Sequence, residues 1–409
     1  MSYEYSEQDG KFTSFKIRQT PCKYGDAVFR QQRIEVGFYN EDGSFVRTIE
    51  NLAIEAKEVT DVPSVVGMEV PAAILLNEND WGFGYFTLNE RAITCFENSL
   101  ANINCSLNRA VIINQLIIMM RQIEYPATRL PNVANQMMDE QNQNLISAVN
   151  GALLAAQSTY LPAESVPKFN KETASFFFKK TAKETQNESL QRFCIDLAIS
   201  FVTDPEHLRM TASWIHEGKI TIDGQSLNFE LSANHKYEIL KAYYASTHFT
   251  LDEKKALKEK ALAGDDSDRA KSASKICDYS LPDPALKDQL WKEIIDAHTT
   301  DTLAELKNKI AGFQQRKQQL DLMIPYFDKY YSLVNKIVET RDREFAEVFM
   351  SALSPAYMAR EEDSAAFGEL LRTANEEKHE YFVLFLKKQI EAIDVIKRSR
   401  TLCETFKLD

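Results

Sequence analysis

The sequence predicts a small antiparallel β-sandwich followed by a long all-α region, an α-solenoid of the HEAT or armadillo kind. Two observations support this prediction. Apolar residues alternate with a period of two up to about residue 90, and beyond it they recur with the helical period of 3.6. The chain of 409 residues, 44% of them hydrophobic, is also large enough to form more than one core.

The first 90 residues show the patterns of short strands joined by polar turns. Ile34, Val36 and Phe38 alternate with charged or small residues, as on a half-buried strand. Residues 40–43 (Asn-Glu-Asp-Gly) supply turn chemistry, and residues 45–49 return as a partner strand. Further short runs are Phe15 with Ile17, Leu52 with Ile54, and Ala73 to Leu76. We therefore expect a flexible start over residues 1–9 and a β-sandwich domain over residues 10–89.

From residue 90 onward the periodicity is helical, and we expect a helical solenoid domain without strands over residues 90–409. One apolar stripe comprises Ile112, Leu116, Met119, Met120 and Ile123, and a second comprises Phe327, Tyr330, Tyr331, Val334, Ile337 and Val338. Two segments have the pattern of a capping box that opens a helix, Thr250 to Glu253 and Thr302 to Glu305. The three tryptophans are interpreted as packing residues: Trp81, Trp214 and Trp291.

Charge and cysteine usage narrow the class of protein. The 48 Lys and Arg against 60 Asp and Glu give a net charge of −12, which disfavours nucleic acid and anionic membranes as partners. No CxxC pair occurs, so the six cysteines are expected to be reduced thiols: Cys22, Cys95, Cys105, Cys194, Cys277 and Cys403. The acidic, polar first ten residues do not resemble a secretory signal, and no run approaches eighteen apolar residues. We expect a cytoplasmic protein.

A search for catalytic motifs assigns no catalytic, cofactor-binding or metal-binding residue. A zinc protease helix needs two His at i and i+4 with a Glu between them, and neither His216-Glu217 nor His379-Glu380 has the second His. Residues 67–70 (Gly-Met-Glu-Val) faintly echo an amine-binding GxMEN loop but lack its Asn. The acidic loop 264–268 is interpreted as a helix cap, since it lacks the ligand spacing of a calcium loop. Nucleophile-elbow and nucleotide-binding motifs are absent from the sequence.

One passage resembles a known family. Residues 73–86 (AILLNENDWGFGYF), with Leu88 after them, are similar to the segment that joins the β-sandwich to the helical domain in M1-family zinc aminopeptidases of the aminopeptidase N type. Further similar segments follow in family order: Asn108-Arg109-Ala110, Pro284 to Trp291 with Lys287, Gly312 to Gln315, Pro325 to Tyr331, Arg341 to Glu344 with Ala346, and Ala352 to Pro355.

The resemblance implies the C-terminal half of such an enzyme. The family's zinc ligands, general base and amine-binding loop would lie upstream of this chain, so the chain alone is expected to be no enzyme and to hold no cofactor, with zinc only in a catalytic half. The favoured function is a non-catalytic module that encloses the active site and peptide chamber of that half. The alternative is an inactive scaffold or interaction subunit of a larger assembly.

Both functions imply a protein partner, and self-association is a further expectation. A face meant for another domain should expose apolar residues on the sandwich or the early helices. The segment 111–120 carries apolar residues on more than one side, which favours this reading, unless the helix is simply central in the stack.

Overall fold

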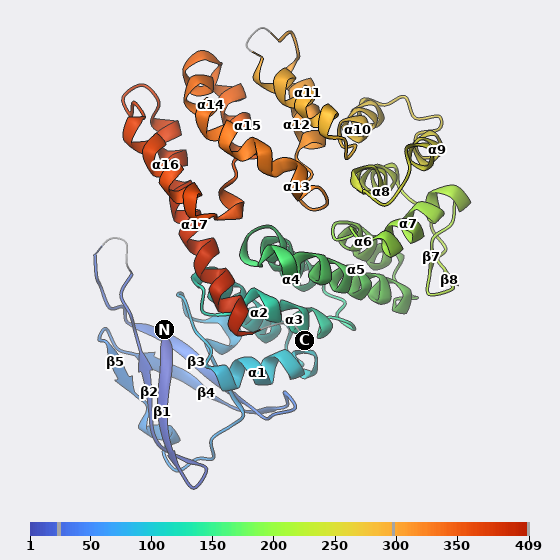
Figure 1. Cartoon of the computed structure of the whole chain (residues 1–409). Helices are drawn as coiled ribbons and strands as arrows, with labels where there is room; N and C mark the ends of the chain where they lie inside the picture. Colours follow the sequence, from blue (N-terminus) through green and yellow to red (C-terminus); the bar gives the residue numbers. More distant parts are fainter. Residues whose placement is uncertain (23–25, 297–298, 407–409) are drawn as a thin grey trace. The chain divides into compact units, whose positions relative to one another are not determined.

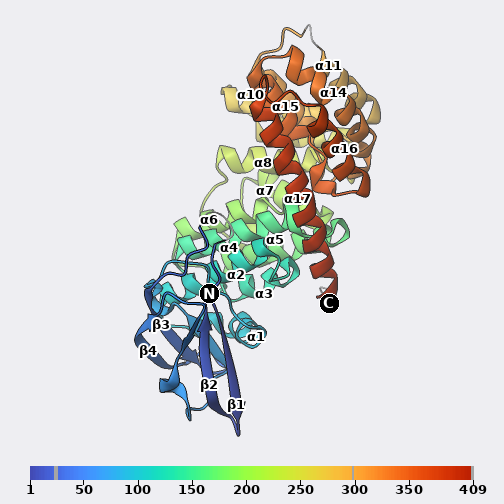
Figure 2. The ribbon, with the colours of Figure 1, turned by 90° about the vertical axis from the view of Figure 1, so that its left-hand side faces the viewer.

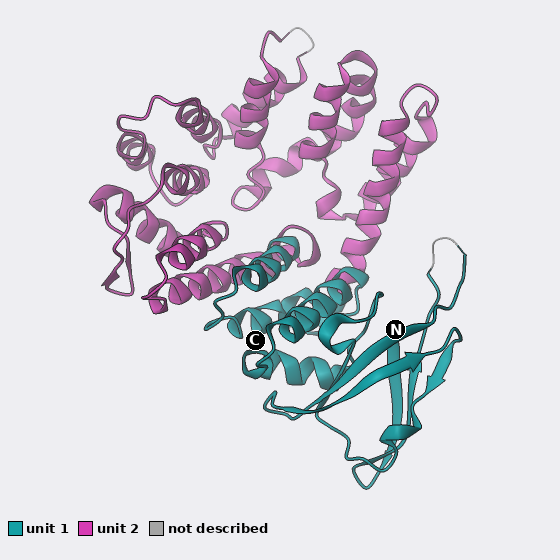
Figure 3. Ribbon diagram, turned by 180° about the vertical axis from the view of Figure 1, so that it is seen from behind, with its two compact units in different colours: residues 1–156, 402–409 teal, residues 157–401 magenta. Residues whose placement is uncertain are grey.

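The computed structural model describes residues 1–22, 26–296 and 299–406 (Figure 1). Two antiparallel sheets come first and a long series of helices follows, so the predicted fold class is confirmed. The chain forms two compact units (Figure 3). Unit 1 comprises Met1–Ala156 with Leu402–Asp409, and unit 2 comprises Gln157–Thr401. The units divide inside the helical part, so domains over 10–89 and 90–409 remain a proposal.

Two three-stranded sheets form the sandwich of unit 1 (Figure 2). The first has the order β1-β2-β5, with β1 Ser2–Gln8, β2 Lys11–Arg18 and β5 Val59–Asp61. The second has the order β4-β3-β6, with β3 Gln32–Tyr39, β4 Phe45–Ile54 and β6 Ala73–Leu76. Their facing side chains share one core that includes Phe12, Phe15, Ile17, Ile34, Val36, Phe38, Ile74 and Leu76. The alternation in the sequence thus predicted which side chains face inward.

The structure corrects the expectation of a flexible start over residues 1–9. Strand β1 pairs with β2 from Ser2 opposite Arg18 to Gln8 opposite Lys11. The physical reason lies in two tyrosines among the polar residues. Tyr3 stacks on Phe15 with ring centroids 5.8 Å apart, and Tyr5 meets the edge of Phe12 at 5.3 Å. Strand β1 is acidic and lies at a sheet edge, but its two tyrosines still pack against buried aromatic side chains of β2.

The α-helices described in unit 1 are α1 Glu90–Ser99, α2 Ser106–Gln122, α3 Leu130–Asn135, α4 Gln143–Ala155 and the last residues of α17 (Glu380–Thr405). The α-helices of unit 2 are α5 Val166–Lys183, α6 Glu188–Ile199, α7 Pro205–Glu217, α8 Ala233–Ala245, α9 Leu251–Ala261, α10 Asp268–Tyr279, α11 Pro284–Ile295, α12 Leu303–Phe313, α13 Leu320–Met323, α14 Phe327–Thr340, α15 Arg343–Leu353, α16 Glu361–Thr373 and most of α17 Glu380–Thr405. Neighbouring helices pack in pairs, as α5 with α6 and α14 with α15 do. The stripe predicted on α14 is confirmed, because Phe327, Tyr330, Val334, Ile337 and Val338 are buried.

The expectation of no strands after residue 90 is wrong at one hairpin. Strands β7 Thr221–Ile222 and β8 Gln225–Ser226 are antiparallel. Asp223 and Gly224 join them with φ of 51° and 77°. Asp-Gly is a strong signal for a two-residue hairpin turn, and here it interrupts a region whose pattern is otherwise helical.

Helix α2 is central in unit 1, which explains its apolar residues on more than one side. Val111, Ile112, Ile113, Leu116 and Met120 are all buried. The buried amide of Gln115 also donates through Nε2 to the carbonyl oxygen of Leu76 in β6, at 3.0 Å. The apolar residues of α2 are therefore explained by burial within unit 1, and they do not indicate an exposed face for a partner.

The two predicted capping boxes differ in outcome. The Thr250 hydroxyl accepts from Glu253 N, and the Glu253 carboxylate returns to Thr250 N at 2.7 Å, so that box is confirmed. Thr302 caps α12 by accepting from Glu305 N at 3.2 Å. The Glu305 carboxylate instead binds Lys275 and Tyr279 of α10. A tertiary ion pair thus replaces the second half of this box.

Three buried polar side chains hold the C-terminal ends of helices in unit 2. The ammonium group of Lys254 donates to Ser246 O at 2.6 Å. Lys287 donates to the carbonyl oxygens of Tyr279, Gly312 and Phe313 at 3.3, 2.8 and 3.2 Å. The Gln319 amide donates to Ala245 O at 2.7 Å and Ser280 O at 2.6 Å. The last carbonyls of a helix lack partners inside it, so these donors supply what α8, α10 and α12 need.

We expect Lys287→Met to lower the free energy of unfolding by about 3 kcal/mol. The apolar side chain would leave three carbonyl oxygens without their buried donor. Lys292→Met is the matched control on the same helix, because Lys292 is 71% exposed and pairs only with the exposed Asp288. Urea unfolding measures both variants. Equal stabilities for the two variants would contradict this role of Lys287.

The same lysine predicts a pH dependence of stability. Burial lowers the pKa of Lys287 to about 7, whereas an unfolded lysine titrates near 10.5. Between those pH values the unfolded chain binds more protons, so stability should rise with pH. From pH 7 to pH 9 we expect wild type to gain about 2 kcal/mol more than Lys287→Met gains. Urea unfolding at both pH values measures this difference, and equal gains would contradict it.

Candidate functional site

The histidine motifs of the sequence do not come together as a metal centre. His216 and Glu217 are exposed at the end of α7, and His379 immediately precedes α17. Among the described residues, no three His, Cys, Asp or Glu side chains lie close enough to hold a metal ion. The described residues therefore offer no cluster of donors that fits a zinc ion. In the same residues, no helix is long and apolar enough to cross a membrane.

The two loop motifs have structural roles. In the segment 67–70, Gly67 has φ of 85° and donates to Phe12 O at 2.8 Å, while Met68 O accepts from Phe12 N. This segment therefore pairs with the beginning of β2. In the acidic loop, Ser267 caps α10 by accepting from Ala270 N, and Asp265 accepts from Ser267 N at 3.1 Å. The interpretation of residues 264–268 as a helix cap is confirmed.

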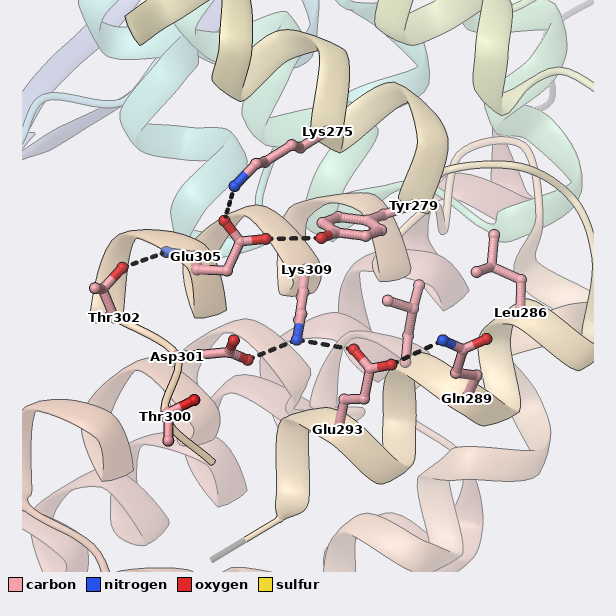
Figure 4. Close-up of a pocket in the computed structure, with 11 residues that line it drawn as sticks. Lys275, Tyr279, Leu286, Gln289, Glu293, Thr300, Asp301, Thr302, Glu305 and Lys309 are labelled. Atoms are coloured by element: carbon pink, nitrogen blue, oxygen red, sulfur yellow. Dashed lines mark hydrogen bonds and ion pairs between the residues drawn. The ribbon is translucent and has the colours of Figure 1, made fainter. Parts of the chain in front are cut away.

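One cavity of about 580 Å³ lies in unit 2 between α10, α11 and α12 (Figure 4). Lys309 lies between Asp301 at 2.6 Å and Glu293 at 2.8 Å. Lys275 and the Tyr279 hydroxyl both reach Glu305. The Lys309 ammonium group lowers the pKa of Glu293 and Asp301, so both carboxyl groups are ionised at neutral pH.

These charged groups satisfy one another. Each of the three carboxylates already accepts from a lysine, and Gln289 also donates to Glu293 at 2.8 Å (Figure 4). A ligand would have to replace these ion pairs to gain a comparable interaction. The cavity is therefore best described as a polar seam that connects three helices.

A second feature is the exposed turn that follows β6 in unit 1. We call residues 77–83, Asn-Glu-Asn-Asp-Trp-Gly-Phe, the aromatic segment. Phe83 is 94% exposed and Trp81 is 69% exposed, the two highest values among the large hydrophobic side chains of the described residues. The prediction that Trp81 is a packing residue is wrong, whereas Trp214 and Trp291 are buried as predicted. Neighbouring exposed aromatic residues are typical of interaction sites.

The same segment also buries a carboxyl group. Glu78 is 3% exposed, and its Oε1 accepts from the Asn108 amide of α2 at 3.1 Å. Its Oε2 is buried without a hydrogen-bond partner among the described residues. The carboxyl group occupies the space that Gly37 leaves open, because a Cβ at position 37 would lie 1.3 Å from Oε2. Burial raises the pKa of Glu78 to about 7.

Sequence reasoning assigned no role to Glu78, and only part of the signal was visible. An acidic residue inside an Asn-rich turn after an apolar strand suggests exposure, which is the usual state of Glu. Asn108 belongs to a segment that already carries the family resemblance, and here it links α2 to the turn through Asn79 N at 2.8 Å. The glycine of the neighbouring strand that makes room for the carboxyl group could not be paired with Glu78 from the sequence.

Gly37→Ala should lower the free energy of unfolding by about 2–3 kcal/mol, because the new Cβ displaces a buried carboxyl group. The matched control is Gly151→Ala in α4, where a Cβ would meet no atom within 4 Å. This control should be neutral or slightly stabilising, since Ala favours a helix over Gly. Thermal unfolding compares the two variants. A Gly37→Ala protein as stable as the control would show that Glu78 is not held over the strand.

Comparison with known proteins adds two findings. The family described as the ERAP1-like C-terminal domain matches residues 73–394. An aminopeptidase N from Streptomyces lividans is 24% identical over 364 residues, which cover 86% of this chain and 41% of that protein. The chain therefore spans about two fifths of the length of the curated relative that it matches. The match of 73–394 begins at β6, includes the aromatic segment and ends within α17.

Proposed function

The chain belongs to the family of ERAP1-like C-terminal domains, and on this premise we propose that it serves as the non-catalytic C-terminal module of an M1-type zinc aminopeptidase. The observation that supports the proposal most is the family match over residues 73–394. In this proposal the module encloses the active site and peptide chamber of a catalytic domain, which supplies the zinc.

The aromatic segment is the surface that would dock against such a partner. Trp81 is 69% exposed and Phe83 is 94% exposed, and burying their apolar surface is favourable by roughly 25 cal/mol per Å². The backbone behind them is fixed, since Phe83 N donates to Gln32 at 3.0 Å and Asn79 N donates to Asn108. A pre-organised aromatic surface loses little conformational entropy on binding.

The alternative function is a scaffold or interaction subunit whose partners are not peptidases. Helical arrays of this kind offer large surfaces for binding other proteins. The same aromatic segment supports this alternative equally well. The two functions differ in the identity of the partner, and the experiment therefore has to identify it.

The tagged chain, added to an extract of its native source, should capture a protein with an HExxH motif. The captured complex should hydrolyse an aminoacyl-p-nitroanilide and lose that activity with 1,10-phenanthroline, whereas the purified chain alone should not hydrolyse it. The double variant Trp81→Ser, Phe83→Ser should reduce capture at least tenfold.

Leu384→Ser is the matched control, because Leu384 is 52% exposed but lies in unit 2. It should capture as much protein as the wild type. Reproducible partners that all lack HExxH and peptidase activity would reject the aminopeptidase module and favour the scaffold. Equal capture by the double variant would exclude the aromatic segment as the docking surface.

A further inference from the structure

The aromatic segment adopts a backbone conformation that needs support. Asn77, Asn79 and Asp80 have φ of 62°, 59° and 57°, in the left-handed region. Asn tolerates this region better than most residues, but three such residues within four positions are uncommon. The Asn77 amide stabilises the turn by donating to Asp80 and to Gly82 O, both at 3.0 Å.

Glu78 connects this turn to the body of unit 1. Asn108 donates to the Glu78 carboxyl group through its side-chain amide and accepts from Asn79 N through its Oδ1. The first of these contacts requires that the carboxyl group remain in its buried place over Gly37. If Glu78 leaves that place, Asn108 loses one of the three groups that align it, and Asn79 N and the Tyr39 hydroxyl remain.

The surroundings of Glu78 suit its neutral form. The groups that act on its pKa after burial itself are Tyr39 and Glu35 of β3, Thr48 of β4 and Asn108 of α2. The two hydroxyl groups and the amide lower this pKa, and the Glu35 carboxylate raises it. None of these four groups is a cation. An ionised Glu78 would thus be a desolvated charge beside another negative charge.

We propose that Glu78 is a proton-operated latch on the aromatic segment. When it is protonated, the carboxyl group stays over Gly37 and the segment keeps the conformation described above. When it loses its proton to solvent, the carboxylate moves out toward water and the turn that presents Trp81 and Phe83 rearranges. The latch is a property of the chain alone. Its effect on docking rests on the proposed function, in which partner capture would differ between pH 6 and pH 8.

Few other groups in unit 1 could produce such a transition. The six histidines of the sequence all lie between residues 207 and 379, within unit 2. The amino group of Met1 is the competing group, because burial lowers its pKa from 8.0 and it donates to Tyr85 O, close to Phe83. A chain with an acetylated amino terminus separates the two possibilities.

The test is ¹⁹F NMR of the whole chain labelled with 5-fluorotryptophan, titrated from pH 5 to pH 9. Three signals are expected from the three tryptophans, and Trp81→Phe identifies one of them. The Trp81 signal should shift with a midpoint near pH 7 in wild type and in the acetylated chain. Glu78→Gln, which is neutral at every pH, should hold the signal at its low-pH position.

Glu35→Gln provides a second variant, whose residue is not buried in the core. Removal of the neighbouring negative charge should move the midpoint to lower pH, an effect that a purely structural role of Glu78 would not produce. A Trp81 signal that is independent of pH, or that titrates unchanged in Glu78→Gln or in Glu35→Gln, would overturn the latch. Failure to capture a peptidase would leave these NMR results intact, so the two proposals fail separately.

Discussion

The arrangement of unit 2 depends on donors that reach the buried C-terminal ends of its helices. A helix leaves its last carbonyl groups without partners, and stacked helix ends cannot rely on water. Lys254, Lys287 and Gln319 supply donors to α8, α10 and α12. Because one side chain serves several helix ends, a shift of any of these helices would expose unsatisfied carbonyls. The apolar core of this region, around Trp291 and Phe313, packs within that polar framework.

Two buried carboxyl groups described in unit 1, those of Glu97 and Glu78, differ in how completely their partners satisfy them. The Glu97 carboxylate is buried. Arg129 neutralises its charge in an ion pair of 2.5 Å, and the Tyr125 hydroxyl donates a hydrogen bond to it, also at 2.5 Å. Glu78 has only neutral donors and one oxygen without a partner among the described residues. A buried carboxyl group with incomplete partners is costly when ionised, and such exceptions often mark functional positions. Here Glu78 belongs to the same segment as Trp81 and Phe83, the most exposed large hydrophobic residues of the described chain.

Periodicity predicted the elements whose burial follows one face, such as β2 and α14. It failed at β1, where two tyrosines outweigh acidic neighbours. The wrong prediction for Trp81 rested on residue type alone, because tryptophan is highly buried on average. The lysine donors share a spacing in the sequence. Lys254 and Lys287 each lie eight residues after the residue whose carbonyl oxygen they bind. The site of Glu78 could not be predicted, because it needs Gly37 and Asn108 from distant parts of the chain. The family resemblance indicated the fold, not these contacts.

The central claim is that the aromatic segment belongs against a catalytic aminopeptidase domain. The most direct measurement replaces Phe83, the most exposed of these side chains, with a photo-reactive benzoylphenylalanine in cells of the native source. Mass spectrometry then identifies the cross-linked peptide. Our account predicts a peptide from an HExxH-containing domain, and the same probe at Leu384 should not yield it. A cross-link at position 83 to proteins without that motif, obtained reproducibly, would contradict the account.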